Sequence, residues 1–204
     1  MLFPLVEFED IPREDRISFF RRWAYCSPIT LRVPITTVEL VKEFAQILVK
    51  FSVRIGPISA TEVDLIGEWL NYGALQVLAY GTVDEICFLG SVFPKDRVVG
   101  MVKQTELESD HVLMALEKHI DEFVIDVSGQ SLGEVLQLVT NLWNKVSKHF
   151  PSGFSVMLDE NQSTNEECAQ TIGLIHHLGG HDGIIDVISS NVSLPGGHQL
   201  CIAK

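Results

Sequence analysis

The sequence of 204 residues lacks several features that mark large classes of protein. Its four cysteines, Cys26, Cys87, Cys168 and Cys201, lie far apart, so neither a CxxC redox motif nor a zinc ribbon is present. Each has apolar neighbours, and we expect buried free thiols in a reducing, cytoplasmic compartment. No apolar run approaches the ~20 residues that a membrane span requires. The opening MLFPLVEFED is acidic and has no basic n-region, so a signal peptide is not expected.

Positive charge is also scarce. Lys and Arg total 15 against 27 Asp and Glu, which gives a formal net charge of -12. Such a surface repels phosphate backbones and anionic lipid, so we expect neither a nucleic-acid partner nor a membrane partner. A local basic pocket for one phosphorylated small molecule remains compatible with this charge. The chain also has no P-loop, no dinucleotide fingerprint and no GxSxG elbow, and no cofactor is predicted.

The sequence does contain short runs of β-branched residues that alternate with amphipathic helical patterns. The alternation is clearest between Phe51 and Val102. Nearly continuous apolar strands separated by helices are typical of a parallel sheet covered by helices. Up to eight strands are predicted, and the last two could form a hairpin; they start at Ile29, Ser52, Leu75, Arg97, Phe123, Phe154, Ile184 and Gln199.

This pattern predicts an α/β fold, a (βα) barrel-like parallel sheet wrapped by helices, complete or incomplete. Eight strands favour the barrel, although about 200 residues is the lower limit for that fold. The alternative is an open doubly wound sheet. We predict one domain over residues 1–204, with residues 1–28 as an N-terminal extension.

Three capping boxes predict where helices begin, because Ser or Thr followed three residues later by Glu satisfies the first free N–H groups. The boxes are Ser59 with Glu62, Ser131 with Glu134, and Thr164 with Glu167.

One stretch resembles a known family. VRIGPI, the following WLNYGA at Trp69–Ala74 and the PKDRVV at Pro94–Val99 are similar to segments of the histidine-biosynthesis sugar isomerases. These barrels open the ribose of an aminoimidazole carboxamide ribotide. The stretch resembles still more the N-terminal region of the fungal trifunctional histidine-biosynthesis protein, a divergent barrel ahead of catalytic domains. The resemblance covers about a quarter of the chain.

The chain departs from the isomerases at two places. Where this chain has Ile55-Gly56-Pro57, the isomerases carry a glycine triplet whose backbone N–H groups approach a phosphate. Pro57 has no N–H to donate. The isomerases also use carboxylates on the first and fifth strands as acid and base. The segment that resembles the fifth strand, Arg97–Val102, carries no acid. The resemblance therefore implies a barrel that has lost isomerase activity.

Several residues remain candidates for a site. Asp126, Asp159 and Asp186 lie within strands or at their ends, and the carboxyl ends of barrel strands face the active site. Asp126 and Asp159 are the predicted acid/base pair, although Asp also caps helices. The predicted ligand-binding residues, all suited to a phosphate, are Gly56, Gly81, Thr82, Gly196 and Gly197.

A histidine-rich segment, HHLGGHD, contains His176, His177, His181 and Asp182. His177 and His181 are four residues apart, but Gly179 and Gly180 break the helix that would align them. A helix carboxyl end explains the histidines better, and no metal site is predicted.

Two main functions follow from these observations. The first is a non-catalytic barrel domain with a scaffold, assembly or regulatory role in histidine biosynthesis, beside cyclohydrolase, pyrophosphohydrolase and dehydrogenase domains of a larger polypeptide. The alternative is an active phosphosugar isomerase that uses two carboxylates at strand carboxyl ends. An interaction domain of unrelated function is a third possibility.

Overall fold

The computed structural model describes residues 2–7, 11, 15–23, 29–32, 48, 51–127, 129–150, 154–158 and 185–189. The strands are β1 (Leu2–Glu7), β2 (Ile29–Arg32), β3 (Val53–Ser59), β4 (Gln76–Tyr80), β5 (Val98–Val102), β6 (Glu122–Asp126), β7 (Phe154–Leu158) and β8 (Ile185–Ser189). The α-helices are α1 (Arg16–Trp23), α3 (Val63–Asn71), α4 (Val83–Val92), α5 (Asp110–His119) and α6 (Leu132–Val146), with 3₁₀ turns η2 (Lys95–Arg97) and η3 (Gln104–Glu108).

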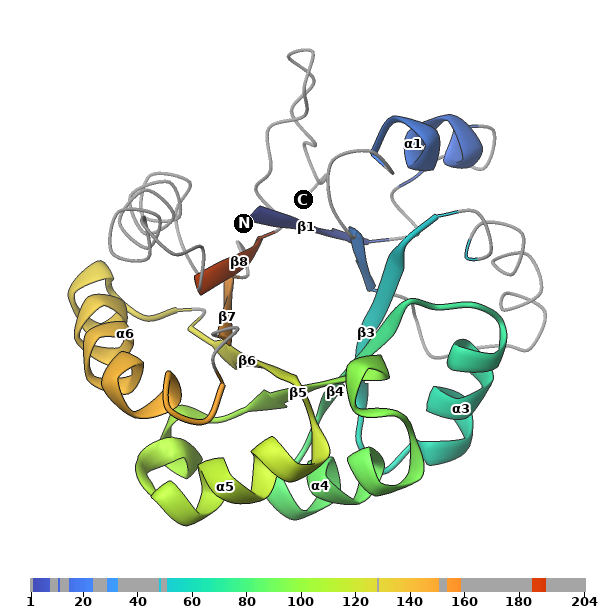
Figure 1. The fold of residues 1–204 in the computed structure, drawn as a ribbon. Helices are drawn as coiled ribbons and strands as arrows, with labels where there is room; N and C mark the ends of the chain where they lie inside the picture. The colour runs from blue at the N-terminus through green and yellow to red at the C-terminus, as the bar shows by residue number, and fades with distance from the viewer. Residues whose placement is uncertain are drawn as a thin grey trace.

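These eight strands close into a barrel in sequence order. Every neighbouring pair is parallel, and β1 pairs with β8 through Leu2 with Val187 and Phe3 with Ile188. Figure 1 shows the ring of strands with α3, α4, α5 and α6 following one another around its outside. The predicted parallel α/β barrel is confirmed, and the closure between β1 and β8 excludes the open doubly wound alternative.

Side chains on the strands divide between the helical layer and the barrel interior, because successive residues of a strand point to opposite faces. Val77, Ala79 and Val98 face outward and join the main core with helix residues such as Ile86 and Leu89. Leu78, Val99, Val124 and Met157 form a separate apolar cluster, one residue from each of β4 to β7. This second cluster fills the interior, as expected for a barrel that is packed rather than hollow.

Two of the predicted capping boxes fall on described residues, and they have different outcomes. At α6 the Ser131 hydroxyl accepts from the Glu134 N–H, and Glu134 accepts in return, as predicted. The box predicted from Ser59 and Glu62 is wrong. The N-cap of α3 is Glu62, without a side-chain hydrogen bond, because Ser59 still belongs to β3 and pairs with Tyr80. Thr164 and Glu167 lie outside the described residues.

The predicted boundaries need two further adjustments. Residues 1–28 were expected to form an extension, whereas the structure places Leu2–Glu7 in the barrel as β1. Apolar residues flanking Pro4 pair with β8 on one side and β2 on the other, so this segment completes the ring. Strands predicted from Ser52, Leu75, Arg97 and Ile184 begin one residue later, and the one predicted from Gln199 lies outside the described residues.

Candidate functional site at the barrel mouth

The carboxyl ends of the strands bring several described side chains to the mouth of the barrel. Tyr80 ends β4, Asp126 ends β6, and Met101 is the fourth residue of β5. Tyr80 and Asp126 each lie two residues beyond a member of the interior cluster, so both share the inner face of the sheet. Both are exposed, whereas Met101 is half-buried against the cluster below. Asp126, Tyr80 and Met101 thus bring a carboxylate, a phenol and a thioether to the mouth, and Arg32 adds a guanidinium at the end of β2.

The predicted acid/base pair is only partly visible. Asp126 is at the inner, carboxyl end of β6, where a catalytic carboxylate of a barrel belongs. Asp159 lies outside the described residues, so the distance between the two remains a prediction. Asp186 is the second residue of β8, in register with Ser155, and thus lies toward the amino end of its strand rather than at the mouth.

The loop after β4 uses its phosphate-binding groups for the helix that follows. Thr82 caps α4: its backbone N–H donates to Glu85 Oε2 at 2.7 Å, and the Glu85 N–H donates to Thr82 Oγ1 at 3.4 Å. These hydrogen bonds, the one from the Thr82 backbone first, hold the pKa of Glu85 below its ordinary value. Glu85 therefore puts a carboxylate where an anion at Gly81 and Thr82 would sit, which opposes a second negative charge.

The backbone conformation and the close packing of β3 on β4 explain why residue 56 is a glycine. Its φ is +140°, a conformation that favours glycine. A Cβ at this position would also lie 2.3 Å from the carbonyl oxygen of Leu78 on the adjacent β4. The close approach of β3 to β4 therefore accounts for this glycine without a ligand. Gly196 and Gly197, the remaining predicted phosphate contacts, lie outside the described residues.

No metal site emerges from the described ranges, where no three His, Cys, Asp or Glu side chains gather closely enough to hold an ion. The HHLGGHD segment falls outside them. Of the described helices, none is long and apolar enough to cross a membrane.

A polar network at the opposite, amino-terminal end of the barrel was not predicted. Arg54 on β3 is 3% exposed, and its Nη2 donates to Gln76 Oε1 at 2.7 Å and to Glu122 Oε2 at 3.0 Å. The Ser155 hydroxyl on β7 donates to Glu122 Oε1 at 3.1 Å. A buried charge must be paired and hydrogen-bonded, so these four strands share one network. The sequence signal was a charged residue at or next to the start of each of two apolar strands, VRIGPIS and EFVID.

Comparisons with known proteins bear on the fold. No protein-family model matches the chain, and no curated protein matches it. Among solved structures, a mutant tryptophan synthase alpha subunit from Pyrococcus furiosus has a TM-score of 0.61 at 12% identity, covering 93% of this chain and 86% of its own. A structure described as an aldolase has a TM-score of 0.55 at 11% identity, covering 92% and 88%. These similarities show that the chain has the (βα) barrel fold, and at such identities they show the fold alone.

Proposed function

We propose that this chain is a barrel domain without isomerase activity, which acts as a scaffold, assembly or regulatory domain in histidine biosynthesis. Its partners would be cyclohydrolase, pyrophosphohydrolase and dehydrogenase domains, as the resemblance at VRIGPI and PKDRVV implies. The barrel fold, shared by the isomerases and by many unrelated enzymes, is compatible with this proposal but does not select it.

The observation that carries the loss of catalysis is the inner face of β5. The isomerases hold one of their two carboxylates on the fifth strand, and β5 here reads Val98-Val99-Gly100-Met101-Val102. Val99 and Met101 occupy the inner positions and pack with Leu78 and Val124. An apolar pair can neither donate nor remove a proton, so the acid/base chemistry of ribose opening lacks one of its partners at this strand.

Two of the loops predicted to bind a phosphate also offer it little. Pro57 has no N–H, Gly56 is explained by its contact with β4, and the amino terminus of α4 carries the carboxylate of Glu85. Phosphate binding by backbone amides needs several free N–H groups directed at one point. Two of the places predicted to supply them are thus poorly suited.

Turnover of the aminoimidazole carboxamide ribotide substrate tests the loss of activity. The purified chain should give no rate above the uncatalysed reaction, and the Asp126→Asn variant should behave identically. Ribose 5-phosphate should leave the melting temperature unchanged. A measurable rate that Asp126→Asn abolishes would refute the proposal.

Association with the pathway needs a separate test. Each of the three catalytic domains would be expressed alone and mixed with this chain, and complex formation and activity would be measured. We expect at least one domain to bind and to change in activity or stability. If all three remain unbound and unchanged, the role in histidine biosynthesis is wrong, whatever the outcome of the turnover assay.

An active phosphosugar isomerase is the second candidate, and Asp126 is the observation that favours it. An exposed carboxylate on the inner face at a strand carboxyl end is the position from which barrel enzymes act. Asp159 would be the second group. This candidate requires a rise of several degrees in melting temperature with a phosphoribosyl ligand, lost in Asp126→Ala.

A further inference from the structure

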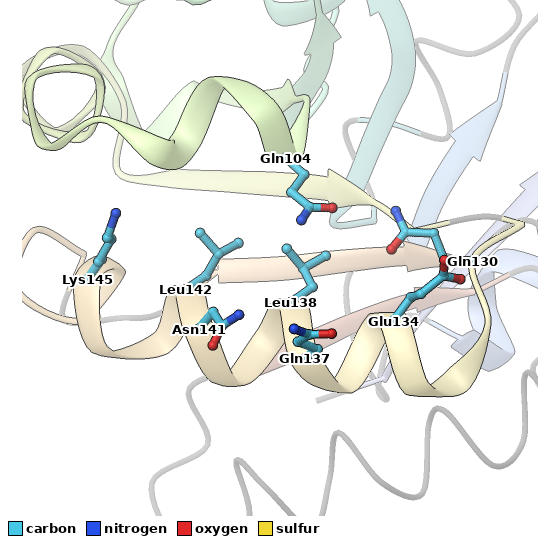
Figure 2. Close-up of a pocket in the computed structure, with 8 residues that line it drawn as sticks. All are labelled: Gln104, Gln130, Glu134, Gln137, Leu138, Asn141, Leu142 and Lys145. Atoms are coloured by element: carbon cyan, nitrogen blue, oxygen red, sulfur yellow. The ribbon is translucent and has the colours of Figure 1, made fainter.

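A groove on the outer surface, outside the ring of strands, carries an inference of its own. It has a volume of about 670 Å³ and runs along α6, with η3 on its far side. Figure 2 shows Gln104 of η3 facing Leu138 of α6 across the groove. Because the groove lies in the helical layer, what binds there is independent of whether the mouth is catalytic.

Carboxamides dominate the lining. Gln104, Gln130, Gln137 and Asn141 all border the groove. A carboxamide presents an N–H donor and a carbonyl acceptor in one plane, the same pair that a peptide group presents, so the two are hydrogen-bonding complements. The groove therefore offers four side chains that match a polypeptide main chain.

The floor gives little apolar surface. Leu138 and Leu142 line it, yet they are only 3% and 6% exposed because both are already packed in the core. A large apolar side chain of a ligand would therefore bury little apolar surface there. Recognition in this groove must depend on the polar rim, which favours main-chain contacts over apolar anchors.

The two ends of the groove carry opposite charges. Glu134, in the first turn of α6, lies at one end and Lys145, in the last turn, at the other (Figure 2). Glu134 is charged at neutral pH, since hydrogen bonds from the side chain and then the backbone of Ser131 lower its pKa. Lys145 comes eleven positions after Glu134, a rise of about 16 Å along the helix axis.

We propose that this groove binds an extended polypeptide segment of another protein, about five residues long, with a basic residue at the Glu134 end and an acidic residue at the Lys145 end. An extended chain rises about 3.3 Å per residue, so the first and fifth residues lie about 13 Å apart, and their long charged side chains cover the rest of the 16 Å between Glu134 and Lys145. A single heterocycle, which carboxamides also recognise, would cover only part of that length.

Capped pentapeptides are the probes. Two mixed-charge peptides, Lys-Val-Thr-Val-Glu and Glu-Val-Thr-Val-Lys, place both charges correctly in one chain direction or the other. Lys-Val-Thr-Val-Lys and Glu-Val-Thr-Val-Glu are the controls. Amide NMR titration of the full chain should show shifts at groove residues, with one mixed-charge peptide at least fivefold tighter than both controls. N-methylation of alternate peptide nitrogens should abolish binding, since it removes the donors.

Matched variants separate contact from folding. Asn141→Asp keeps the shape and loses the N–H donors, so affinity should fall about five- to tenfold, the equivalent of one hydrogen bond. Asn144→Asp makes the same change on an exposed α6 residue outside the groove and should alter affinity less than twofold. Lys145→Glu should reverse the preference toward Lys-Val-Thr-Val-Lys, whereas Lys148→Glu should not.

Several outcomes would overturn the proposal. They are no shift at groove residues with any peptide, equal affinity for all four peptides, or equal effects of Asn141→Asp and Asn144→Asp. A titration in which adenosine shifts the groove residues and the peptides do not would assign the groove to a small heterocycle instead. Melting temperatures within about 2 °C of the wild type confirm that each variant is folded.

Discussion

The buried pair Arg54–Glu122 gives the sharpest test of how the barrel is held together. The two side chains meet at 3.0 Å, where a charge pair in an effective dielectric of 20 attracts by roughly 5 kcal/mol before desolvation is subtracted. Their exposure differs: 3% for the Arg54 side chain and 27% for Glu122. Loss of either partner therefore has unequal consequences, because only Glu122 can regain water.

Glu122→Gln leaves a guanidinium buried beside neutral partners, and we expect a cost of about 3 kcal/mol, the lower end for breaking a buried pair. Arg54→Met removes the buried charge, leaves Glu122 near solvent and should cost about 2 kcal/mol. In the Glu122→Gln background the same Arg54→Met change should be neutral or stabilising. The pair then shows a coupling energy of about 2 kcal/mol.

Urea unfolding at pH 7, followed by circular dichroism, measures all four proteins. For a domain of this size, 1 kcal/mol corresponds to roughly 2–4 °C in melting temperature. Glu68→Gln, on the exposed face of α3, is the matched control and should stay within about 0.5 kcal/mol. Equal costs of Arg54→Met in both backgrounds would refute the reasoning, because the pair would then not be a coupled unit.

Other predictions concern single positions. Gly133→Ala should stabilise by about 0.5–1 kcal/mol, since a Cβ on this helical glycine meets nothing within 4 Å; Gly90→Ala should destabilise by at least about 2 kcal/mol, since its Cβ would lie 2.1 Å from the His119 carbonyl oxygen. Paired thermal melts check both signs. Because the pKa of Glu85 is lowered from 4.5, its contribution to stability is full above pH 4.5 and is lost as the pH falls through the folded-state pKa. Glu85→Gln should therefore flatten the acid limb of the stability curve, and NMR titration should show the Glu85 pKa rising in Thr82→Ala. Thr30 is 1% exposed, and its buried hydroxyl finds no hydrogen-bond partner among the described residues, so Thr30→Val should raise the urea midpoint by the equivalent of about 1 kcal/mol.

Local pattern was sufficient to predict most strands. Runs such as Phe154–Leu158 are apolar and bounded by turn residues, and the structure moves the predicted starts by one residue at most. The pairing of β1 with β8 was beyond local reasoning, because it joins residues more than 180 positions apart and β1 contains a proline. Barrel closure depends on all the strands together, and the number of predicted strands was the sequence feature that indicated it.

The site was less predictable than the fold. Asp126 could be placed because a residue ending an apolar strand must lie at the sheet edge. Arg54 could not, since within VRIGPIS its parity alone does not distinguish the barrel interior from the helical layer. The predicted phosphate role of Gly81 and Thr82 rested on composition, and the same residues also make a capping box. Which of the two uses applies depends on the Glu85 carboxylate, which is visible only in three dimensions.

The position of the Arg54 network separates side chains that hold the barrel together from those at its mouth. The network joins β3, β4, β6 and β7 at their amino-terminal ends. It links β3 to β6, which backbone hydrogen bonds do not pair directly. A slip of one residue in β3 would turn Arg54 out of the interior and leave Glu122 without its partner, so the network selects the register. Asp126 and Met101 lie at the opposite end, with the apolar layer of Leu78 and its neighbours between. Substitutions at the mouth should therefore leave stability almost unchanged, and substitutions in the network should leave any ligand affinity of the folded protein unchanged. Such independence would allow the residues of a reaction centre to be replaced without loss of the barrel.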